Sequence, residues 1–373
     1  MNDRYSESSS SEFNVSQKLL LGPGPSNLTD SVKHALAQPA LGHLDPEFLE
    51  ILDETCDLLR WIFKTENKVT FPISATASGG MEAVVKNLVN SNGKVVIASN
   101  GAFSLRAKNM MERLGAKVTE VSSEWGTKVD VSQLNSAIKA ITPDLIWIVH
   151  GETSTGVLNK IESIDKGDAL LVVDCVTSLG GVDFRMDEWG IDVAVSGTQK
   201  CLNAPPGLSP VSFSPNAIKR LKKSDSWYFD LGLINEYISS DGPRTYHHTA
   251  PINMIYALRA SLLYISNFGL TQTFEKHRIA AEYLYSCLEE LGMELVVPVD
   301  CRLPQLTTVF IPENLAHREA EVRRILLSEF NIEIGAGLGV FAGKVWRIGM
   351  MGVNATTTNV DTLINALSSI INN

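Results

Sequence analysis

The chain has 373 residues, of which 44% are hydrophobic and 20% are charged, and its formal net charge is −10. This length exceeds one minimal domain and favours a large domain with a smaller companion. The acidic balance argues against nucleic acid or an anionic membrane as a partner, because both select basic surfaces.

Two further features bear on the cellular environment. The five cysteines are odd in number and form no C-x-x-C pair, which argues against a disulfide framework or a metal site and favours a reducing compartment. Residues 1–16 are polar and serine-rich without the apolar core of a secretion signal, and no apolar run reaches the ~18 residues of a membrane span. We therefore expect a cytoplasmic protein with a loose N-terminal tail, no bound metal and no membrane partner.

Beyond the tail, predicted strands and helices alternate. At 45–63 apolar residues recur every three or four positions, and the Asp45-Pro46-Glu47 start is typical of a helix N-terminus. The next strand, loop and helix share the segment 68–89. Further strands are predicted at 94–101, 116–123, 144–156, 169–181 and 191–197, and further helices at 102–115 and 131–141. This alternation is typical of βαβ units and predicts an α/β fold with a doubly wound, mostly parallel sheet.

The pattern changes near residue 250. Two long amphipathic helices are predicted at 252–269 and 271–292, and shorter elements follow at 307–312, 320–331 and 345–352. They indicate a smaller C-terminal α+β domain. We divide the chain into the tail at 1–16, a large domain at 17–260 and the small domain at 261–373.

Polar groups collect where the predicted parallel strands end, which is the edge at which such sheets bind ligands. Small residues at 75–80 precede a helix, so its first N–H groups, with Thr76 and Ser78, form a cradle for phosphate. The sequence has no Walker motif and no G-x-G-x-x-G dinucleotide fingerprint, which argues against a dehydrogenase. Taken alone, this segment is better explained as an ordinary helix N-cap.

A carboxylate and a lysine complete this set. Asp174 ends a run of five apolar residues, where a charge is costly unless a cation faces it or it caps the following turn. Lys200 follows "DVAVSGTQ"; it is either a surface lysine or an amine whose pKa burial lowers. A phosphate cradle, an acid for a pyridinium nitrogen and a Schiff-base lysine together predict pyridoxal phosphate as the cofactor.

The sequence resembles the class V aminotransferases of fold type I, in particular the alanine–glyoxylate and serine–pyruvate group. The resemblance extends from about residue 17 to the end. Its motifs are "LLLGPGPSN", "HGETSTGVL", "VVDCVTSLGG", "SGTQKCLNAPPG", "YHHTAP", "RLPQLTTV" and "KVWRIGMMG". It implies a large domain with a seven-stranded sheet and a smaller domain. It also places the segment 17–45 near the substrate and the dimer interface.

The resemblance also implies roles for individual residues. Lys200 corresponds to the lysine of the internal aldimine and Asp174 to the acid that pairs with the pyridine nitrogen. Other positions that correspond to cofactor contacts are Thr76, Ala77, Ser78, Phe103, Ser154, Gln199, Tyr246 and Thr249. Tyr246 and Thr249 correspond to residues that reach the phosphate of the other subunit, which implies a homodimer with shared active sites.

Three positions are implicated in substrate binding. Arg347 corresponds to the arginine that holds the α-carboxylate, a role that suits the fork of a guanidinium. The resemblance places the turn around Gly24 near the substrate, a close approach that only glycine permits. His43 lies in the segment that sets specificity, where it either lines the pocket or packs.

These observations predict a transaminase that moves an amino group from alanine or serine to glyoxylate or pyruvate by ping-pong chemistry. Ureidoglycine–glyoxylate or 2-aminoethylphosphonate–pyruvate transamination, and a specialised biosynthetic transamination, stay open as alternatives. A cysteine desulfurase is disfavoured because no cysteine follows Cys301. A non-enzymatic binding protein would not explain both Lys200 and Arg347.

Overall fold

The computed structural model describes residues 15–239 and 242–371, so most of the predicted tail lies outside the described residues. Its larger part is built on a seven-stranded sheet in the order β2-β10-β9-β8-β5-β3-β4. The strands are β2 (Val69–Ile73), β3 (Lys94–Ser99), β4 (Lys117–Ser122), β5 (Leu145–Val149), β8 (Leu170–Asp174), β9 (Val193–Val195) and β10 (Ser209–Phe213). Within this sheet β10 runs antiparallel to both neighbours and the other strands share one direction. The predicted mostly parallel sheet of seven strands is confirmed.

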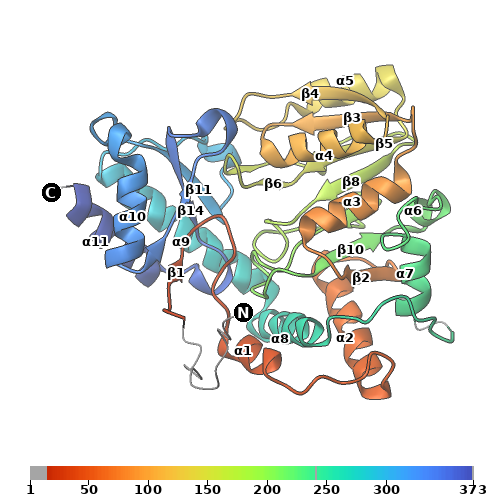
Figure 1. The fold of residues 1–373 in the computed structure, drawn as a ribbon. Helices are drawn as coiled ribbons and strands as arrows, with labels where there is room; N and C mark the ends of the chain where they lie inside the picture. The colour runs from red at the N-terminus through yellow and green to blue at the C-terminus, as the bar shows by residue number, and fades with distance from the viewer. Residues whose placement is uncertain (1–14, 240–241, 372–373) are drawn as a thin grey trace, which may run out of the picture.

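Helices cover both faces of this sheet because its central strands have no solvent-facing side. Every residue of β5 and β8 is buried. The helices of this part are α1 (Asp30–Leu36), α2 (Pro46–Phe63), α3 (Ala77–Leu88), α4 (Ala102–Arg113), α5 (Val131–Ile141), α6 (Pro215–Lys219), α7 (Leu231–Ile238) and α8 (Ile252–Phe268). In Figure 1, α3 and α4 lie in front of the sheet, while α2 and α8 lie below it.

The start of α2 shows how local sequence sets an element. The Asp45 side chain accepts a hydrogen bond from the Glu47 backbone N–H at 2.9 Å, and Pro46 occupies the first turn, where its missing N–H costs nothing. The predicted helix start is therefore confirmed.

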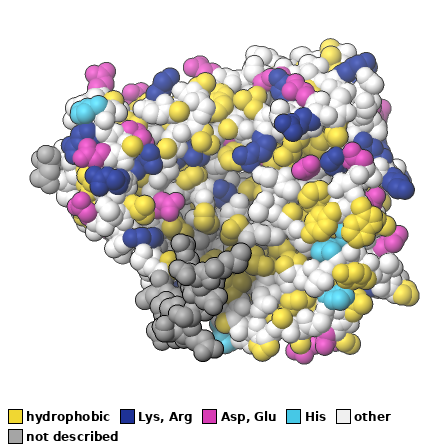
Figure 2. Space-filling model, in the orientation of Figure 1, with side chains coloured by type: hydrophobic (Ala, Val, Ile, Leu, Met, Phe, Trp, Pro, Cys, Tyr) yellow, Lys and Arg dark blue, Asp and Glu magenta, His cyan; other side chains and the backbone are white. Residues whose placement is uncertain are grey.

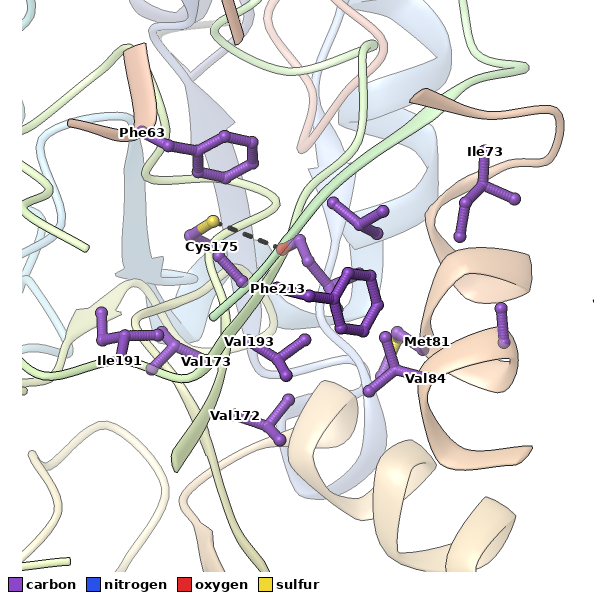
Figure 3. Packing of buried hydrophobic residues seen from close by; sticks show 14 of the residues in the cluster. Phe63, Ile73, Met81, Val84, Val172, Val173, Cys175, Ile191, Val193 and Phe213 are labelled. Carbon is purple, nitrogen blue, oxygen red and sulfur yellow. Dashed lines mark hydrogen bonds between the residues drawn. The ribbon is translucent and has the colours of Figure 1, made fainter. Parts of the chain in front are cut away.

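The large core lies between the sheet and these helices. Figure 3 shows buried side chains of this core, among them Phe63, Met81, Val172 and Phe213, and the Cys175 thiol donates to a backbone carbonyl of β9 at 3.3 Å. All five cysteines are free thiols. The closely packed interior fixes the strand ends that carry the polar groups.

The smaller part has its own core and a three-stranded sheet, β11-β14-β13. Its elements are α9 (Leu270–Glu290), β11 (Leu306–Phe310), α10 (Glu319–Glu329), β12 (Ile332–Glu333), β13 (Gly335–Ala336), β14 (Val345–Gly349) and α11 (Thr357–Ile371). The short hairpin β6 (Gly151–Glu152) and β7 (Val157–Leu158) belongs to the loop after β5. The predicted domain boundary at residue 260 falls inside α8, whose buried side chains pack in the larger core as far as Ile265.

The N-terminal segment belongs to both parts. Strand β1 (Leu19–Leu20) pairs in parallel with β12, and Leu21 packs in the smaller core. Residues 22–27 then cross to the larger part, and α1 packs against α8. Figure 1 shows this segment beside the C-terminal strands before it turns towards α1.

Two features are not found within the described residues, a membrane-spanning helix and a cluster of metal-ligating side chains. No helix there combines the length and apolarity needed to span a bilayer, and no cluster of His, Cys, Asp or Glu could hold a metal ion. On the face drawn in Figure 2, lysine and arginine side chains are interspersed with aspartate and glutamate.

Candidate active site

A cavity of about 170 Å³ lies where β2, β5, β8 and β9 end, at the edge of the sheet where the sequence predicts a ligand. Seven predicted site residues line it: Thr76, Ala77, Ser78, Phe103, Asp174, Gln199 and Lys200. Its other lining residues are Met81, Arg106, Val149, Gly151, Thr153, Val176 and Thr177.

The first turn of α3 forms one wall of this cavity. Thr76 is the N-cap residue, and its side chain makes no capping bond within the helix. Gly80 lets α3 approach β10, because a Cβ at that position would overlap the Ser209 hydroxyl. The backbone N–H groups of the first turn therefore face the cavity together with the Thr76 and Ser78 side chains, as expected of an anion cradle.

Lys200 reaches the cavity from the loop after β9. Its side chain is buried, and its Nζ donates to the carbonyl of Pro23. The pKa of the Lys200 amine is lowered to about 8, mainly by burial and to a smaller extent by the positive charge of Arg347. A substantial fraction of this amine is neutral, and hence nucleophilic, near neutral pH.

Asp174 ends β8 on the other side of the same cavity. It is 3% exposed, and its Oδ1 accepts from the Val176 N–H at 2.9 Å. Burial raises the pKa of the carboxyl to about 7; the hydrogen bond from Val176 opposes this rise and the charge of Glu152 adds to it. A cationic ligand nitrogen beside Asp174 would hold the carboxylate ionised.

Gly24 and Arg347 are not among the lining residues, but each contacts one of them, Gly24 the side chain of Lys200 and Arg347 the backbone of Thr153. Gly24 has φ +99°, and a Cβ there would lie 2.6 Å from Lys200 Cδ, so only glycine permits this approach to the lysine. Its predicted approach to the substrate stays a prediction. Arg347 on β14 is buried; its Nε donates to Ala336 O at 2.7 Å and its Nη1 to Thr153 O at 3.1 Å. Burial lowers the pKa of this guanidinium to about 10, so it stays cationic at neutral pH.

Asn203 connects the segments that carry these groups. Its Nδ2 donates to Ser26 Oγ at 2.7 Å and to Asn27 O at 3.0 Å, and its Oδ1 accepts from Val353 N at 2.8 Å. Its φ of +51° is one that asparagine tolerates better than most residues. The loop of Lys200, the loop of Gly24 and the segment after β14 are thus held in one arrangement.

Behind the cavity, the start of α4 is built on a buried carboxylate. Glu152 accepts from the N–H groups of Phe103 at 3.2 Å and Ser104 at 3.3 Å, and from the Ser154 hydroxyl at 2.6 Å. Ser154 also accepts from Ala102 N at 2.8 Å. Ser154 therefore supports the helix that carries Phe103, and it is Gly151 and Thr153 of its loop that line the cavity.

Sequence reasoning did not single out three of these groups. Arg106 lies three residues after Phe103, a spacing that puts both side chains on one helix face. This spacing was the only feature of the sequence that could have pointed to Arg106. Glu152 and Asn203 act through contacts with residues distant in the sequence, for which no local pattern exists.

His43, Tyr246 and Thr249 lie outside the cavity lining. The rings of His43 and Tyr246 are 4.8 Å apart, and the Tyr246 hydroxyl lies 3.4 Å from that of Thr249. Tyr246 is 54% exposed. The structure thus groups these three residues on the surface of one chain, and their predicted roles stay predictions.

Comparison with known proteins agrees with this geometry. The family model of class-V aminotransferases matches residues 28–363. The alanine–glyoxylate aminotransferase of Drosophila melanogaster is 37% identical, over 96% of this chain and 93% of that protein. The (S)-ureidoglycine–glyoxylate transaminase of Bacillus subtilis is 34% identical, over 95% of this chain and 90% of that protein. The solved structure of an alanine–glyoxylate aminotransferase from Nostoc sp. is 43% identical, with a TM-score of 0.92 over 96% of this chain and 97% of that one. The chain therefore belongs to the class-V aminotransferases, shares their fold type I architecture and is a transaminase.

Proposed function

We propose that this transaminase uses pyridoxal phosphate bound through Lys200 to move an amino group from alanine or serine to glyoxylate or pyruvate. One observation carries the proposal. The buried amine of Lys200, whose pKa is lowered, and the buried carboxylate of Asp174 line the same cavity, and the N-terminus of α3 forms one wall of it.

The residues present fit this cofactor. The first turn of α3 with Thr76 and Ser78 suits a phosphate, and Asp174 suits a protonated pyridine nitrogen. Gln199 lines the cavity, and its Oε1 is buried with no hydrogen-bond partner among the described residues, so this acceptor is free for a donor group of a ligand. Phe103 offers a ring face for stacking.

Bound in this way, pyridoxal phosphate supplies an aldehyde for amine exchange and a ring that accepts electrons. Asp174 holds the proton of the ring nitrogen. Arg347 binds the α-carboxylate of the substrate through its guanidinium fork. Lys200 would hold the aldehyde of the cofactor, and its free amine would be the base that moves the proton of the substrate Cα.

A half-reaction tests the proposal. Mixing the loaded protein with excess L-alanine should convert the aldehyde form of the cofactor to its amine form, seen in the absorption spectrum, and release pyruvate. Borohydride should fix the cofactor on the peptide that contains Lys200, and the Lys200→Ala protein should take up no label there. A Lys33→Ala protein, changed at an exposed lysine, is the control. Labelling of the Lys200→Ala protein, or no conversion with any amino donor, would contradict the assignment.

A second substrate pair is favoured by one observation, the likeness to ureidoglycine–glyoxylate transaminases. A solved structure of that enzyme from Bacillus subtilis has a TM-score of 0.93 at 34% identity. A screen decides among the candidate substrate pairs. It combines alanine, serine, ureidoglycine and 2-aminoethylphosphonate as amino donors with glyoxylate and pyruvate as acceptors. A specialised biosynthetic transaminase would be active with none of these pairs.

The proposal includes a cytoplasmic homodimer in which each chain completes its partner's site. Trp227 is 63% exposed and stacks on His247 at 4.4 Å, and Tyr246 is also exposed, so aromatic surface is available near the predicted contacts. Figure 2 shows hydrophobic and histidine side chains gathered at the right of the drawn face. Analytical ultracentrifugation should give twice the chain mass, and a Tyr246→Ala protein should bind cofactor more weakly. A monomer with full activity would refute the shared site.

A further inference from the structure

One cation in the cavity wall has no role in the account above. Arg106 lies on α4, and its Nη1 donates to the Ser78 hydroxyl at 2.9 Å, so it contacts the cradle residue directly. Its guanidinium carbon lies 4.8 Å from the centre of the Phe103 ring, which holds the side chain over the cavity wall.

Arg106 forms no ion pair among the described residues, although the carboxylate of Asp174 lines the same cavity and interacts with it at a distance. Arg106 and Lys200 are the two cations among the residues that line it, and Lys200 is turned to the Pro23 carbonyl. Within the described residues, no carboxylate forms an ion pair with Arg106. An exposed guanidinium at the mouth of a polar cavity, already bonded to one side of an anion cradle, is suited to binding an anion.

The charge of the expected ligand exceeds what the cradle supplies. A phosphate monoester carries about −1.5 to −2 charges at pH 7, whereas a helix N-terminus supplies about +0.5. The fork of a guanidinium matches phosphate oxygens bidentately and adds a full positive charge.

Resting on the proposed cofactor, we propose that Arg106 is a phosphate ligand of pyridoxal phosphate, bound from the mouth of the cavity. In this arrangement it neutralises the phosphate at the start of α3, while its contact with the Phe103 ring fixes its direction. It is thus a binding residue that joins the cradle on α3 to the stacking residue on α4.

The test compares two aldehydes that differ only in the phosphate. Cofactor-free protein is titrated with pyridoxal phosphate and with pyridoxal, and the dissociation constants are read from absorbance and protein fluorescence. Arg106→Gln should weaken binding of pyridoxal phosphate by roughly 10- to 100-fold, the usual effect of losing a charged hydrogen bond, and change binding of pyridoxal less than about 2-fold. Arg106→Lys, which keeps the charge without the fork, should lie between Arg106→Gln and the unchanged protein.

The control is Arg113→Gln, an exposed arginine at the other end of the same helix, which should leave both constants unchanged. Equal weakening of both aldehydes by Arg106→Gln would show that Arg106 merely supports Phe103 and would overturn the inference, as would unchanged binding of pyridoxal phosphate. In either case the proposed function would stand. If the unchanged protein binds neither aldehyde, the proposed function fails first.

Discussion

Replacing Gly24 by alanine tests how tightly the site is built around Lys200. The new Cβ would lie 2.6 Å from Lys200 Cδ and 2.7 Å from its Nζ, so the lysine must move to accommodate the methyl group. Because the atoms that clash are the flexible end of a side chain, the lysine yields before the backbone does. We therefore expect the clash in Gly24→Ala to slow the reaction of Lys200, in addition to the backbone strain that the positive φ adds to folding.

The magnitude has two contributions. An alanine at φ +99° costs on the order of 1–3 kcal/mol of folding stability. Moving Lys200 out of its preferred rotamer costs about 0.5–1.5 kcal/mol, which corresponds to a roughly 2- to 10-fold slower capture of pyridoxal phosphate. Stopped-flow absorbance measures the capture, and urea unfolding measures the stability.

A matched control separates these contributions. Gly292 has φ +74°, and a Cβ there would meet nothing within 4 Å, so Gly292→Ala carries backbone strain without a clash. It should lose similar stability and capture the cofactor at the original rate. If Gly24→Ala captures the cofactor as fast as Gly292→Ala does, the contact between Gly24 and Lys200 does not orient the amine and the reasoning is refuted.

Three more predictions follow from the buried groups. The rate of cofactor capture should rise with pH around a midpoint of about 8, and Arg347→Gln should move that midpoint upward because it removes a positive charge near Lys200; an unmoved midpoint would exclude this coupling. Burial lowers the pKa of His150 and His277 to about 4, so as pH falls below 6.5 these histidines bind protons in the unfolded chain before they do in the folded one. The free energy of unfolding, measured with urea, should therefore be lower at pH 4.5 than at pH 7 by on the order of 2 kcal/mol for each histidine. Equal free energies at the two pH values would argue against burial of neutral histidines. Asn203→Gly keeps the backbone at φ +51° unstrained but removes the hydrogen bonds that Asn203 makes to Ser26 and Val353. It should lower the free energy of unfolding, measured with urea, by about 2 kcal/mol and raise the KM for alanine. An unchanged KM would show that these hydrogen bonds do not position Arg347.

The parts of the fold that could be predicted are those whose signal is local. Asp45 and Pro46 mark the start of α2 within three residues, and β5 and β8 are unbroken apolar runs. Strand β10 was not found from its residues, because "SPVSF" is short and contains a proline and two serines. The resemblance alone implied the seventh strand.

The site residues likewise fall into those that local sequence predicts and those that depend on distant contacts. Asp174 and Lys200 follow recognisable strands, and parallel topology brings strand ends together, so their proximity could be predicted. The chain end that carries Gly24, and the contacts of Glu152 and Asn203, depend on packing between distant segments. Whether Tyr246 and Thr249 act on a partner's site depends on a second chain and cannot be read from one.

The pairing of β1 with β12 has a consequence for synthesis. Lys18 bonds to Asn331 across 313 positions of sequence, and Leu21 fills a core whose other walls come from the last third of the chain. While the ribosome is still making that last third, residues 18–21 therefore have no place to dock. Pro23 and Gly24, which lie against Lys200, are thus anchored on one side only until β12 has been made.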